Sequence, residues 1–397
     1  MKILFMTVGT GVGGGEEKNK DLKIKNLAHG LLYSITRHNP DTTIFFGSKE
    51  SLKTVEEIKK QYSEDKKEEL NYEFVEISDI DSFYACYEKM EKKIKEYEGN
   101  DILIDYTSGT KTMTTTAAIV AMLYQKKLYL ISGKRGKNGI VVPGTEEVRE
   151  QNLFAAYNKY AFDKAKEAFN SYRYEDAKNY LKQIVGMEET KDYKEIVEAY
   201  YLWDKFEHEK AQEKLANVKN DILNQNKSFL GKLSKAKWRE EFLIPDLLNN
   251  AYRRIEEGKY DDAVARLYRV IEMVAQYRLK EKYGLNPSEI KWGDLETKSV
   301  KNLEKYENKR DERGIIRLAL QECYQLLKDL NDEIGNVIED KELKDLLKKR
   351  NESILAHGIE PVNKEEAVKL FEKAKEIAKK VIEKLENYME ISKFPKL

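Results

Sequence analysis

The residues whose types and spacing best suit a chemical task lie in one turn, residues 105–113, which read DYTSGTKTM. An apolar run at 102–104 precedes the turn and a helical pattern from 112 onward follows it, so the sequence predicts a strand that leads directly into a helix. Free backbone N–H groups and the positive end of the helix dipole then point at any ligand above the sheet. Gly109 allows close approach to the backbone, and Lys111 adds positive charge. We interpret this turn as a phosphate site; the alternative is an ordinary capped helix with a spare lysine.

A second loop, rich in glycine, follows the first apolar run. Residues 7–15 read TVGTGVGGG, in which Gly9, Gly11 and Gly14 form a GxGxxG pattern. A dinucleotide site normally enters its helix straight after the glycines and carries an acidic residue at the end of its second strand. Here residues 16–19 intervene, and that acidic residue is missing. The loop is therefore either part of a different ligand cleft or a flexible surface loop.

A third group of chemically capable residues lies in 343–358, which read LKDLLKKRNESILAHG. At helical spacing one face of this segment carries Leu343, Leu347, Arg350, Ile354 and His357. Burying an unpaired guanidinium costs several kcal/mol, so this face must meet an acidic partner, a polar cleft or a second subunit. Alternatively, Arg350 pairs with an acid elsewhere, and His357 caps a helix end before Gly358.

Apolar runs alternate with helical patterns over the first 148 residues. The runs are 3–8, 43–46, 72–77, 102–105 and 128–131, with a hairpin partner at 139–142, and the helical stretches are 22–37, 52–62, 82–97 and 112–124. This alternation predicts an α/β, Rossmann-like domain with a doubly wound, mostly parallel sheet. In the commonest strand order the first and fourth strands are neighbours at the switch point where ligands bind. We therefore expect the two polar loops to lie together.

From about residue 152 the pattern is helical almost without interruption, which predicts an all-α C-terminal half. Pro245 and the segment 284–287 are the clearest breaks. We expect three parts. They are a ligand-sensing domain at 1–148, a helical connector at 149–248 and a helical domain at 249–397.

Composition narrows the range of partners. The 397 residues include 71 basic and 71 acidic side chains, and this zero balance argues against nonspecific wrapping of duplex DNA without excluding a small basic pocket. Cys86 and Cys323 are far apart and lack metal-binding spacing, so we interpret them as reduced core thiols. Neither a signal peptide nor a membrane span is predicted. We expect a cytoplasmic protein with no membrane partner.

Together the two polar loops resemble the two signature motifs of the CARF domain, the sensor of cyclic oligoadenylate in type III CRISPR immunity. The resemblance covers roughly the first 148 residues, and DYTSGTKTM is its more specific part. It implies a ligand cleft lined by Gly9, Thr10, Gly11, Thr107, Ser108, Gly109, Thr110 and Lys111. The basic turn 134–137 would edge this cleft. Since a two-fold symmetric ring is best read by two copies of one loop set, we expect a homodimer.

Arg350 and Asn351 followed by His357 resemble the signature of HEPN ribonucleases, whose domain is all-helical. Residues 262–272 (DAVARLYRVIE) are similar to the helix that precedes the active helix in CARF–HEPN proteins. Arg266 and Arg269 in that stretch can equally be solvent-facing charges. The two resemblances support each other because one chain carries both.

The chemistry of these side chains suits RNA cleavage without a metal ion or cofactor. A base must take the proton of the ribose 2′-OH, and positive charge must stabilise the pentavalent phosphate. His357 suits proton transfer near neutral pH, Arg350 suits bidentate phosphate contact, and Asn351 would orient a phosphate or the 2′-OH. The remaining histidines, His29, His38 and His208, are interpreted as surface or structural. No cluster has metal-ligand spacing.

The resemblance therefore implies a cyclic-oligoadenylate-activated endoribonuclease that cuts single-stranded RNA in CRISPR antiviral defence, with cyclic tetra-adenylate as the favoured activator. Its products would carry 2′,3′-cyclic phosphate ends, and an additional ring-nuclease activity stays open. One alternative is a sensor of the same ring whose helical domain is a non-catalytic dimerisation or interaction module. A second alternative, a nicotinamide-dependent oxidoreductase using the glycine loop, is disfavoured by the missing ribose acid.

Overall fold

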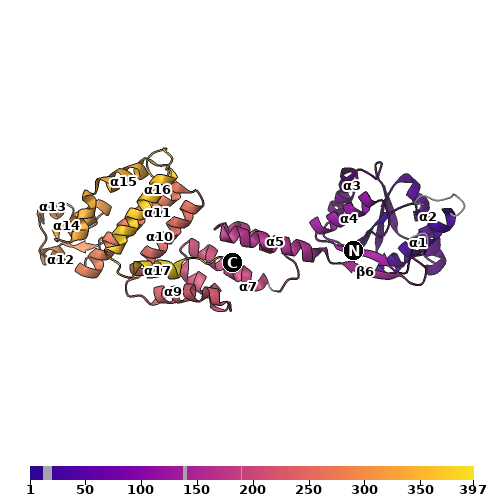
Figure 1. The fold of residues 1–397 in the computed structure, drawn as a ribbon, viewed down its shortest axis with the longest axis horizontal. Coiled ribbons are helices and arrows are strands. Elements are labelled where there is room, and N and C mark those ends of the chain that lie inside the picture. The colour runs from indigo at the N-terminus through magenta and orange to yellow at the C-terminus, as the bar shows by residue number, and fades with distance from the viewer. Residues whose placement is uncertain (12–19, 137–140, 189) are drawn as a thin grey trace. The chain divides into compact units, whose positions relative to one another are not determined.

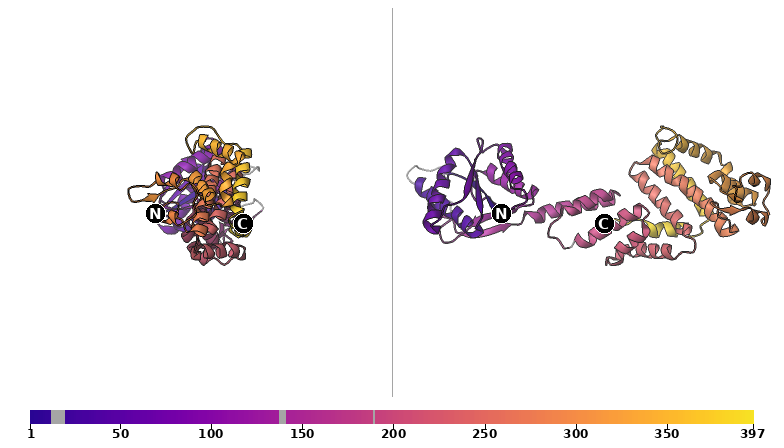
Figure 2. Two further views of the ribbon diagram at one scale, coloured as in Figure 1. Left: turned by 90° about the vertical axis from the view of Figure 1, so that its left-hand side faces the viewer. Right: turned by 180° about the vertical axis from the view of Figure 1, so that it is seen from behind.

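The chain folds into two compact units, residues 1–160 and 161–397 (Figures 1 and 2). The computed structural model describes residues 1–11, 20–136, 141–188 and 190–397. The first unit contains a six-stranded sheet with helices, and the second is helical apart from a pair of two-residue strands. Both predicted fold classes, α/β Rossmann-like and all-α, are confirmed.

The sheet of the first unit places the two polar loops side by side. Its strands are arranged in the order β3-β2-β1-β4-β5-β6. β1 (Lys2–Val8) lies between β2 (Thr42–Gly47) and β4 (Asp101–Asp105), and both pairings are parallel. The remaining strands are β3 (Tyr72–Glu76), β5 (Lys127–Ser132) and β6 (Glu147–Gln151). Because β1 and β4 are parallel neighbours, the loops that follow them leave the same edge of the sheet, as predicted.

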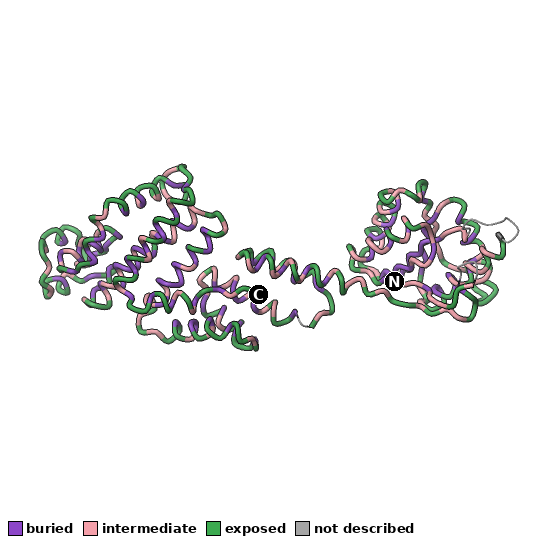
Figure 3. The backbone as a smooth tube through the Cα atoms, viewed as in Figure 1, coloured by how far each residue is buried: buried purple, intermediate pink, exposed green. Residues whose placement is uncertain are grey.

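Helices cover both faces of this sheet (Figure 1). The helices α1 (Lys20–His38) and α2 (Leu52–Lys66) pack on one face, and α3 (Phe83–Glu96) and α4 (Lys111–Leu123) pack on the other. Side chains of β1 alternate between two cores: Ile3 and Phe5 meet α3 and α4, whereas Leu4, Met6 and Val8 meet α1 and α2. The three central strands β1, β2 and β4 are therefore buried over almost their whole length (Figure 3).

The antiparallel edge of the sheet differs from the expectation. The hairpin partner predicted at 139–142 is wrong, because the strand that pairs with β5 is β6 at Glu147–Gln151. Residues 139 and 140 lie outside the described part of the chain, and Val141 forms only an isolated bridge with Arg135. β6 reads EVREQ, a polar sequence typical of a solvent-facing edge strand, which a search for apolar runs misses.

The second unit is a set of packed helices, of which the first, α5, begins in the first unit at Leu153 and continues into the second. They are α5 (Leu153–Asn170), α6 (Tyr174–Lys182), α7 (Thr190–Asp204), α8 (His208–Ala216), α9 (Asn224–Lys235), α10 (Glu240–Glu256), α11 (Tyr260–Tyr283), α12 (Trp292–Glu296), α13 (Glu304–Glu307), α14 (Leu320–Asp329), the 3-10 helix η4 (Glu333–Glu339), α15 (Lys341–Glu352), α16 (Lys364–Lys379) and α17 (Leu385–Ser392). α11 is central, since α10, α14, α15 and α16 all pack against it.

Of the two predicted breaks in the helical half, one is confirmed and one is wrong. α11 ends where predicted, at Gly284, whose φ of 70° is the left-handed conformation of a helix C-cap. Pro245, in contrast, lies buried inside α10. It stands early in that helix, where its missing N–H removes one backbone hydrogen bond, to the carbonyl of Glu241, and the helix continues. The domain border predicted at residue 248 therefore falls within a continuous helix.

Cys86 and Cys323 are buried free thiols, as predicted. Burial raises the pKa of both, that of Cys323 to about 12, so both thiols stay protonated near neutral pH. In the described ranges of the chain, no helix is long and apolar enough to cross a membrane.

Candidate functional site

The loops after β1 and β4 line a cleft of about 450 Å³ at the carboxyl edge of the sheet. The predicted ligand residues that line it are Gly9, Thr10, Gly11, Thr107, Ser108, Gly109 and Thr110. Lys111 is not among the lining residues; it begins α4 and its side chain is exposed. The structure thus brings both sequence motifs into one site but leaves the lysine at its outside.

Hydrogen bonds between the two loops hold the cleft wall together. The Thr7 hydroxyl donates to the carbonyl of Ser108, and the Gly9 N–H donates to Ser108 Oγ at 3.0 Å. The Gly9 carbonyl accepts from Thr54 Oγ1 at 2.9 Å. A Cβ on Gly9 would lie 3.2 Å from the backbone nitrogen of Gly109, so glycine permits this close approach. The two loops therefore act as one surface.

The turn after β4 is anchored by a buried carboxyl group. Asp105 is fully buried and accepts hydrogen bonds from the Ser34 hydroxyl and, at 2.8 Å, from the Thr107 N–H. Burial raises the pKa of Asp105 because the charged carboxylate is removed from water. Thr107 Oγ1 accepts from the Ile131 N–H at 2.7 Å, which ties the turn to β5. Ser108 Oγ is an acceptor here, so its hydroxyl keeps a hydrogen for a ligand, whereas the Thr107 hydroxyl also bonds to the Asp105 carboxyl.

Thr110 has a structural task in addition to lining the cleft. Its hydroxyl accepts from the Met113 N–H at 3.2 Å as the N-cap of α4 and donates to the Ile80 carbonyl at 2.9 Å. Gly109 before it has a φ of 124°, which a residue with a side chain rarely adopts. The turn thus needs threonine and glycine for its own shape.

Sequence reasoning missed several lining residues. Asn26 and Gly30 come from α1 and Ser48 follows β2, and none of them belongs to a motif. Arg135, from the predicted basic turn, does line the cleft and is the one charged side chain among its described lining residues. Lys137, Gly14 and residues 16–19 lie outside the described residues.

The Arg350–His357 segment is not one continuous helix, which corrects the predicted stripe. α15 ends at Glu352, and Ser353 is extended with φ −80° and ψ 163°. The chain then folds back, so that the His357 N–H donates to the Asn351 carbonyl at 3.1 Å. A Cβ on Gly358 would lie 1.9 Å from the Glu352 carbonyl oxygen, so only glycine fits this turn. Backbone contacts therefore bring His357 near Asn351, and Ile354 is exposed rather than on a buried stripe.

The guanidinium of Arg350 lies over the ring of Tyr268 in α11, with Cζ 4.2 Å from the ring centroid. Its Nη1 donates to Asn351 Oδ1 at 3.1 Å, while its buried Nε has no hydrogen-bond partner among the described residues. Asn351 and His357 are exposed. Arg350 is thus oriented by an aromatic residue that the sequence reasoning missed, because a tyrosine on a helix reads equally well as core.

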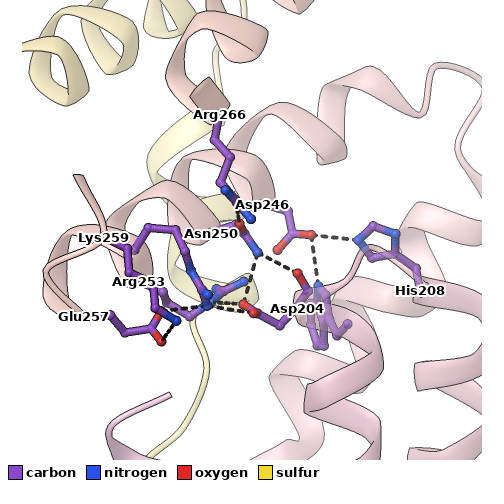
Figure 4. A network of polar contacts seen from close by, with 10 residues as sticks. Asp204, His208, Asp246, Asn250, Arg253, Glu257, Lys259 and Arg266 are labelled. Carbon is purple, nitrogen blue, oxygen red and sulfur yellow. Dashed lines mark hydrogen bonds and ion pairs between the residues drawn. The ribbon is translucent and has the colours of Figure 1, made fainter. Parts of the chain in front are cut away.

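The helix residues singled out near position 266 have two different environments. Arg269 is partly exposed and pairs with Glu272, as a solvent-facing charge does. Arg266 instead donates to Asn250 Oδ1 and joins a network of polar contacts (Figure 4). At the centre of this network, which we call the Asp204 network, the Asp204 carboxylate accepts from Arg253 at 2.9 Å and Arg254 at 2.7 Å. The network links α7, α10 and α11.

The other histidines have structural or surface positions, as predicted. His208 is buried, and its Nε2 lies 2.7 Å from Asp246 Oδ2 in a polar contact beside the Asp204 network (Figure 4). Burial, followed by the charge of Lys2, lowers the pKa of His38. His29 is exposed, with Nε2 3.2 Å from Glu146. No group of three or more potential metal ligands occurs in the part of the chain that the structure describes.

Two family models match adjacent stretches of the helical half. The Csm6 6H domain matches residues 157–244, and the Csm6 HEPN domain matches residues 232–381 and so includes Arg350, Asn351 and His357. The chain belongs to the Csm6 family. It is thus a CARF–HEPN protein of the type III CRISPR systems, as the two motifs predicted. The two Csm6 models overlap at residues 232–244, from the end of α9 to the start of α10, and Pro245 directly follows this overlap.

A solved Csm6 shares the fold of this chain. The structure of Enterococcus italicus Csm6 bound to cyclic hexa-2′-fluoro-hexa-dAMP superposes with a TM-score of 0.61 at 13% sequence identity. The match covers 99% of this chain and 98% of that one. No curated protein matches the sequence. At this coverage the match includes both units of this chain.

Proposed function

We propose that this Csm6 protein is an endoribonuclease of CRISPR antiviral defence, which a cyclic oligoadenylate activates and which cuts single-stranded RNA without a metal ion. The observation that carries the proposal is the gathering of Arg350, Asn351 and His357 within the segment that matches the HEPN model. These side chains supply a cation, an amide and a proton-transfer group around one small surface.

In the proposed reaction His357 transfers the proton between the ribose 2′-OH and the leaving 5′-oxygen, which leaves a 2′,3′-cyclic phosphate. The guanidinium group of Arg350 makes a bidentate contact with the phosphate and stabilises the charge of the pentavalent state. Its contact with Tyr268 restricts the guanidinium before RNA binds, which lowers the entropic cost of that contact. Asn351 orients the phosphate or the 2′-OH.

The same segment supports assembly into a homodimer. Ile354, Leu355 and Ile359 are exposed by 67%, 49% and 85%, and they flank His357 in the sequence. A second copy that covers these apolar side chains would place two Arg350–His357 pairs across a two-fold axis. We therefore propose a composite site at the dimer interface.

The activator would bind in the cleft of the α/β unit. The hydroxyl of Ser108 and the backbone of the glycine loop offer donors, and Arg135 offers charge, which suits a ring that carries several phosphates. The ligand named for the Enterococcus italicus protein is a cyclic hexanucleotide, which supports a ring as the ligand class. Cyclic tetra-adenylate stays our favoured activator, and the hexa-adenylate is its direct competitor.

The test incubates the purified protein with end-labelled single-stranded RNA, with cyclic tetra-adenylate, cyclic hexa-adenylate or no ring, all in EDTA. We expect one ring to accelerate cleavage and mass spectrometry to find cyclic phosphate ends. Loss of activity in EDTA would contradict the metal-free chemistry. Ring binding without any cleavage would favour the alternative, a sensor with a non-catalytic helical domain.

A further inference from the structure

A cavity of about 370 Å³ lies beside the candidate cleavage site, between α11, α14, η4 and α15. We call it the α14–α15 pocket. Its lining residues are Ile271, Leu320, Gln321, Tyr324, Val337, Ile338, Leu343, Lys344, Leu347, Lys348 and Asn351. No step of the proposed reaction uses it, although Asn351 belongs to both sites.

The floor of the pocket is apolar and its rim is polar. Ile271, Tyr324 and Leu343 are buried, and the Tyr324 hydroxyl donates to the Ile271 carbonyl at 2.8 Å, so this polar group is already satisfied. The exposed rim carries two amides and two amines: Gln321, Asn351, Lys344 and Lys348. Such a cavity suits a flat, largely apolar group with hydrogen-bonding edges and a nearby negative charge.

The rim lies along one face of α15 and leads to Arg350. Lys344, Leu347, Lys348 and Asn351 recur at helical spacing, and the outer two are separated by roughly 10 Å along the helix axis. Asn351 accepts a hydrogen bond from Arg350 Nη1 at 3.1 Å, so the end of the pocket adjoins the guanidinium proposed to hold the phosphate. This span is comparable to a nucleotide with its flanking phosphates.

We propose that the α14–α15 pocket binds one nucleobase of the RNA substrate, next to the phosphate that is cut, and thereby sets the base preference of cleavage. This proposal rests on the proposed ribonuclease function. The apolar floor takes the face of an unstacked base, and the amides of Gln321 and Asn351 read its edge. Lys344 and Lys348 contact the adjoining phosphates.

The chemistry of the rim favours a nucleobase over other occupants. An apolar side chain from a second copy of this chain would fill the floor but would not use Gln321 and Lys344 at the rim. An RNA strand, in contrast, would contact the apolar floor with a base and the lysines of the rim with its phosphates. Since Asn351 Oδ1 already accepts from Arg350, its NH₂ group is the part that remains to donate to a base.

The test maps cleavage of a random-sequence single-stranded RNA library by the ring-activated protein, by sequencing the cut ends, and measures KM on one substrate. We expect the wild type to prefer one base beside the cut. Gln321→Ala should weaken this preference about three- to tenfold, because one or two hydrogen bonds to the base edge are lost. Leu347→Trp should fill the pocket and raise KM at least about fivefold.

Val368→Trp is the matched control, because Val368 is a partly exposed apolar residue on the neighbouring α16 and does not line the pocket. Its base preference and KM should equal those of the wild type. Light scattering on all variants should report the same oligomeric state. A changed oligomeric state of Leu347→Trp, with the base preference kept in Gln321→Ala, would assign the pocket to a subunit contact and overturn the proposal.

The outcomes separate this inference from the proposed function. A wild type that cuts no RNA would refute the ribonuclease and the base pocket together. A wild type that cuts RNA, with Gln321→Ala and Leu347→Trp unchanged in base preference and KM, would refute the base pocket alone. Gln321 is exposed, so its truncation tests the proposal even if Leu347→Trp fails to fold.

Discussion

In the cleft of the α/β unit, Gly9, Thr107 and Ser108 are fixed by hydrogen bonds to neighbouring loops and strands, whereas His357 of the helical unit presents an exposed imidazole and is positioned by its backbone. Arg350 combines one aromatic contact with a buried Nε that has no hydrogen-bond partner in the described ranges. The cleft is thus organised within one chain. The cleavage site presents reactive groups whose remaining partners are RNA and, as we propose, a second subunit.

This difference predicts that substitutions in the cleft will change the affinity for the ring, whereas substitutions at the cleavage site will change the rate of RNA cleavage. In the cleft, backbone geometry carries the site, so a change of glycine should lower ligand affinity. At the cleavage site single side chains carry the chemistry, so a truncation should lower the rate without unfolding the protein.

The largest expected effect belongs to His357→Ala. Single-turnover cleavage at saturating ring should fall about 10²- to 10⁴-fold, the usual contribution of a general acid or base. Because His357 is exposed, the melting temperature and the ring affinity should stay at their wild-type values. His29→Ala, an exposed histidine of the α/β unit, is the control and should cut RNA normally. A loss below about tenfold would remove His357 from the reaction.

Gly109→Ala should weaken ring binding by about ten- to a hundredfold. Its φ of 124° strains any residue with a side chain by roughly 1–3 kcal/mol, and the new Cβ would press on Thr7 and Met113 at 3.3 Å. Calorimetry measures the affinity. Gly99→Ala is the control, since Gly99 also has a positive φ but no atoms within 4 Å of the added Cβ. Equal ring affinities of the two variants would show that the turn does not shape the cleft.

A smaller effect distinguishes two cations near the cleft. Arg135 lines the cleft and Lys111 does not, so Arg135→Ala should lower ring affinity about tenfold and Lys111→Ala about threefold at most. Each variant loses one positive charge, so long-range attraction of the anionic ring changes equally in both. Titration calorimetry of the two variants at one salt concentration makes the comparison. The reverse order would place the phosphates over the start of α4.

The smallest expected effect is a pH dependence of the free energy of unfolding, which arises from Asp105 beneath the cleft. Burial raises the pKa of Asp105 above 3.8, so the native state holds this proton more tightly than the unfolded chain does. The free energy of unfolding therefore falls as pH rises from about 4 toward the native pKa and is level above it. Asp105→Asn has no charge to desolvate, so its stability relative to the wild type should rise over this range. Urea unfolding at several pH values measures this, and parallel curves would contradict it.

Much of the α/β unit could be predicted because its signals are local. Apolar runs gave the parallel strands, and the parallel pairing of β1 with β4 then followed from the usual strand order. The edge strand β6 was not predicted because its polar sequence lacks an apolar run. Asn26 escaped because the residues of a helix that face a cleft depend on packing, which a single sequence does not encode locally.

At the cleavage site the residue types were recognised but their geometry was not. In the sequence the helical spacing of the residues continues past Glu352. In the structure, however, Ser353 is extended and Gly358 packs on the Glu352 carbonyl. Gly358 was the available signal for this fold-back. Tyr268 had none, since its role depends on α11 packing against α15.

The Asp204 network has a consequence for how the helical unit unfolds. Asp204 ends α7, in the segment that matches the 6H model, while Arg253 and Arg254 belong to α10, in the segment that matches the HEPN model. Parting the two segments would leave the buried Arg253 without its carboxylate partner, at a cost of about 3–5 kcal/mol, whereas Arg254 would keep its ion pair with Glu257 at 2.9 Å. The two family domains should therefore melt in a single cooperative transition, and a truncation that removes residues 161–248 should not leave a stable ribonuclease domain.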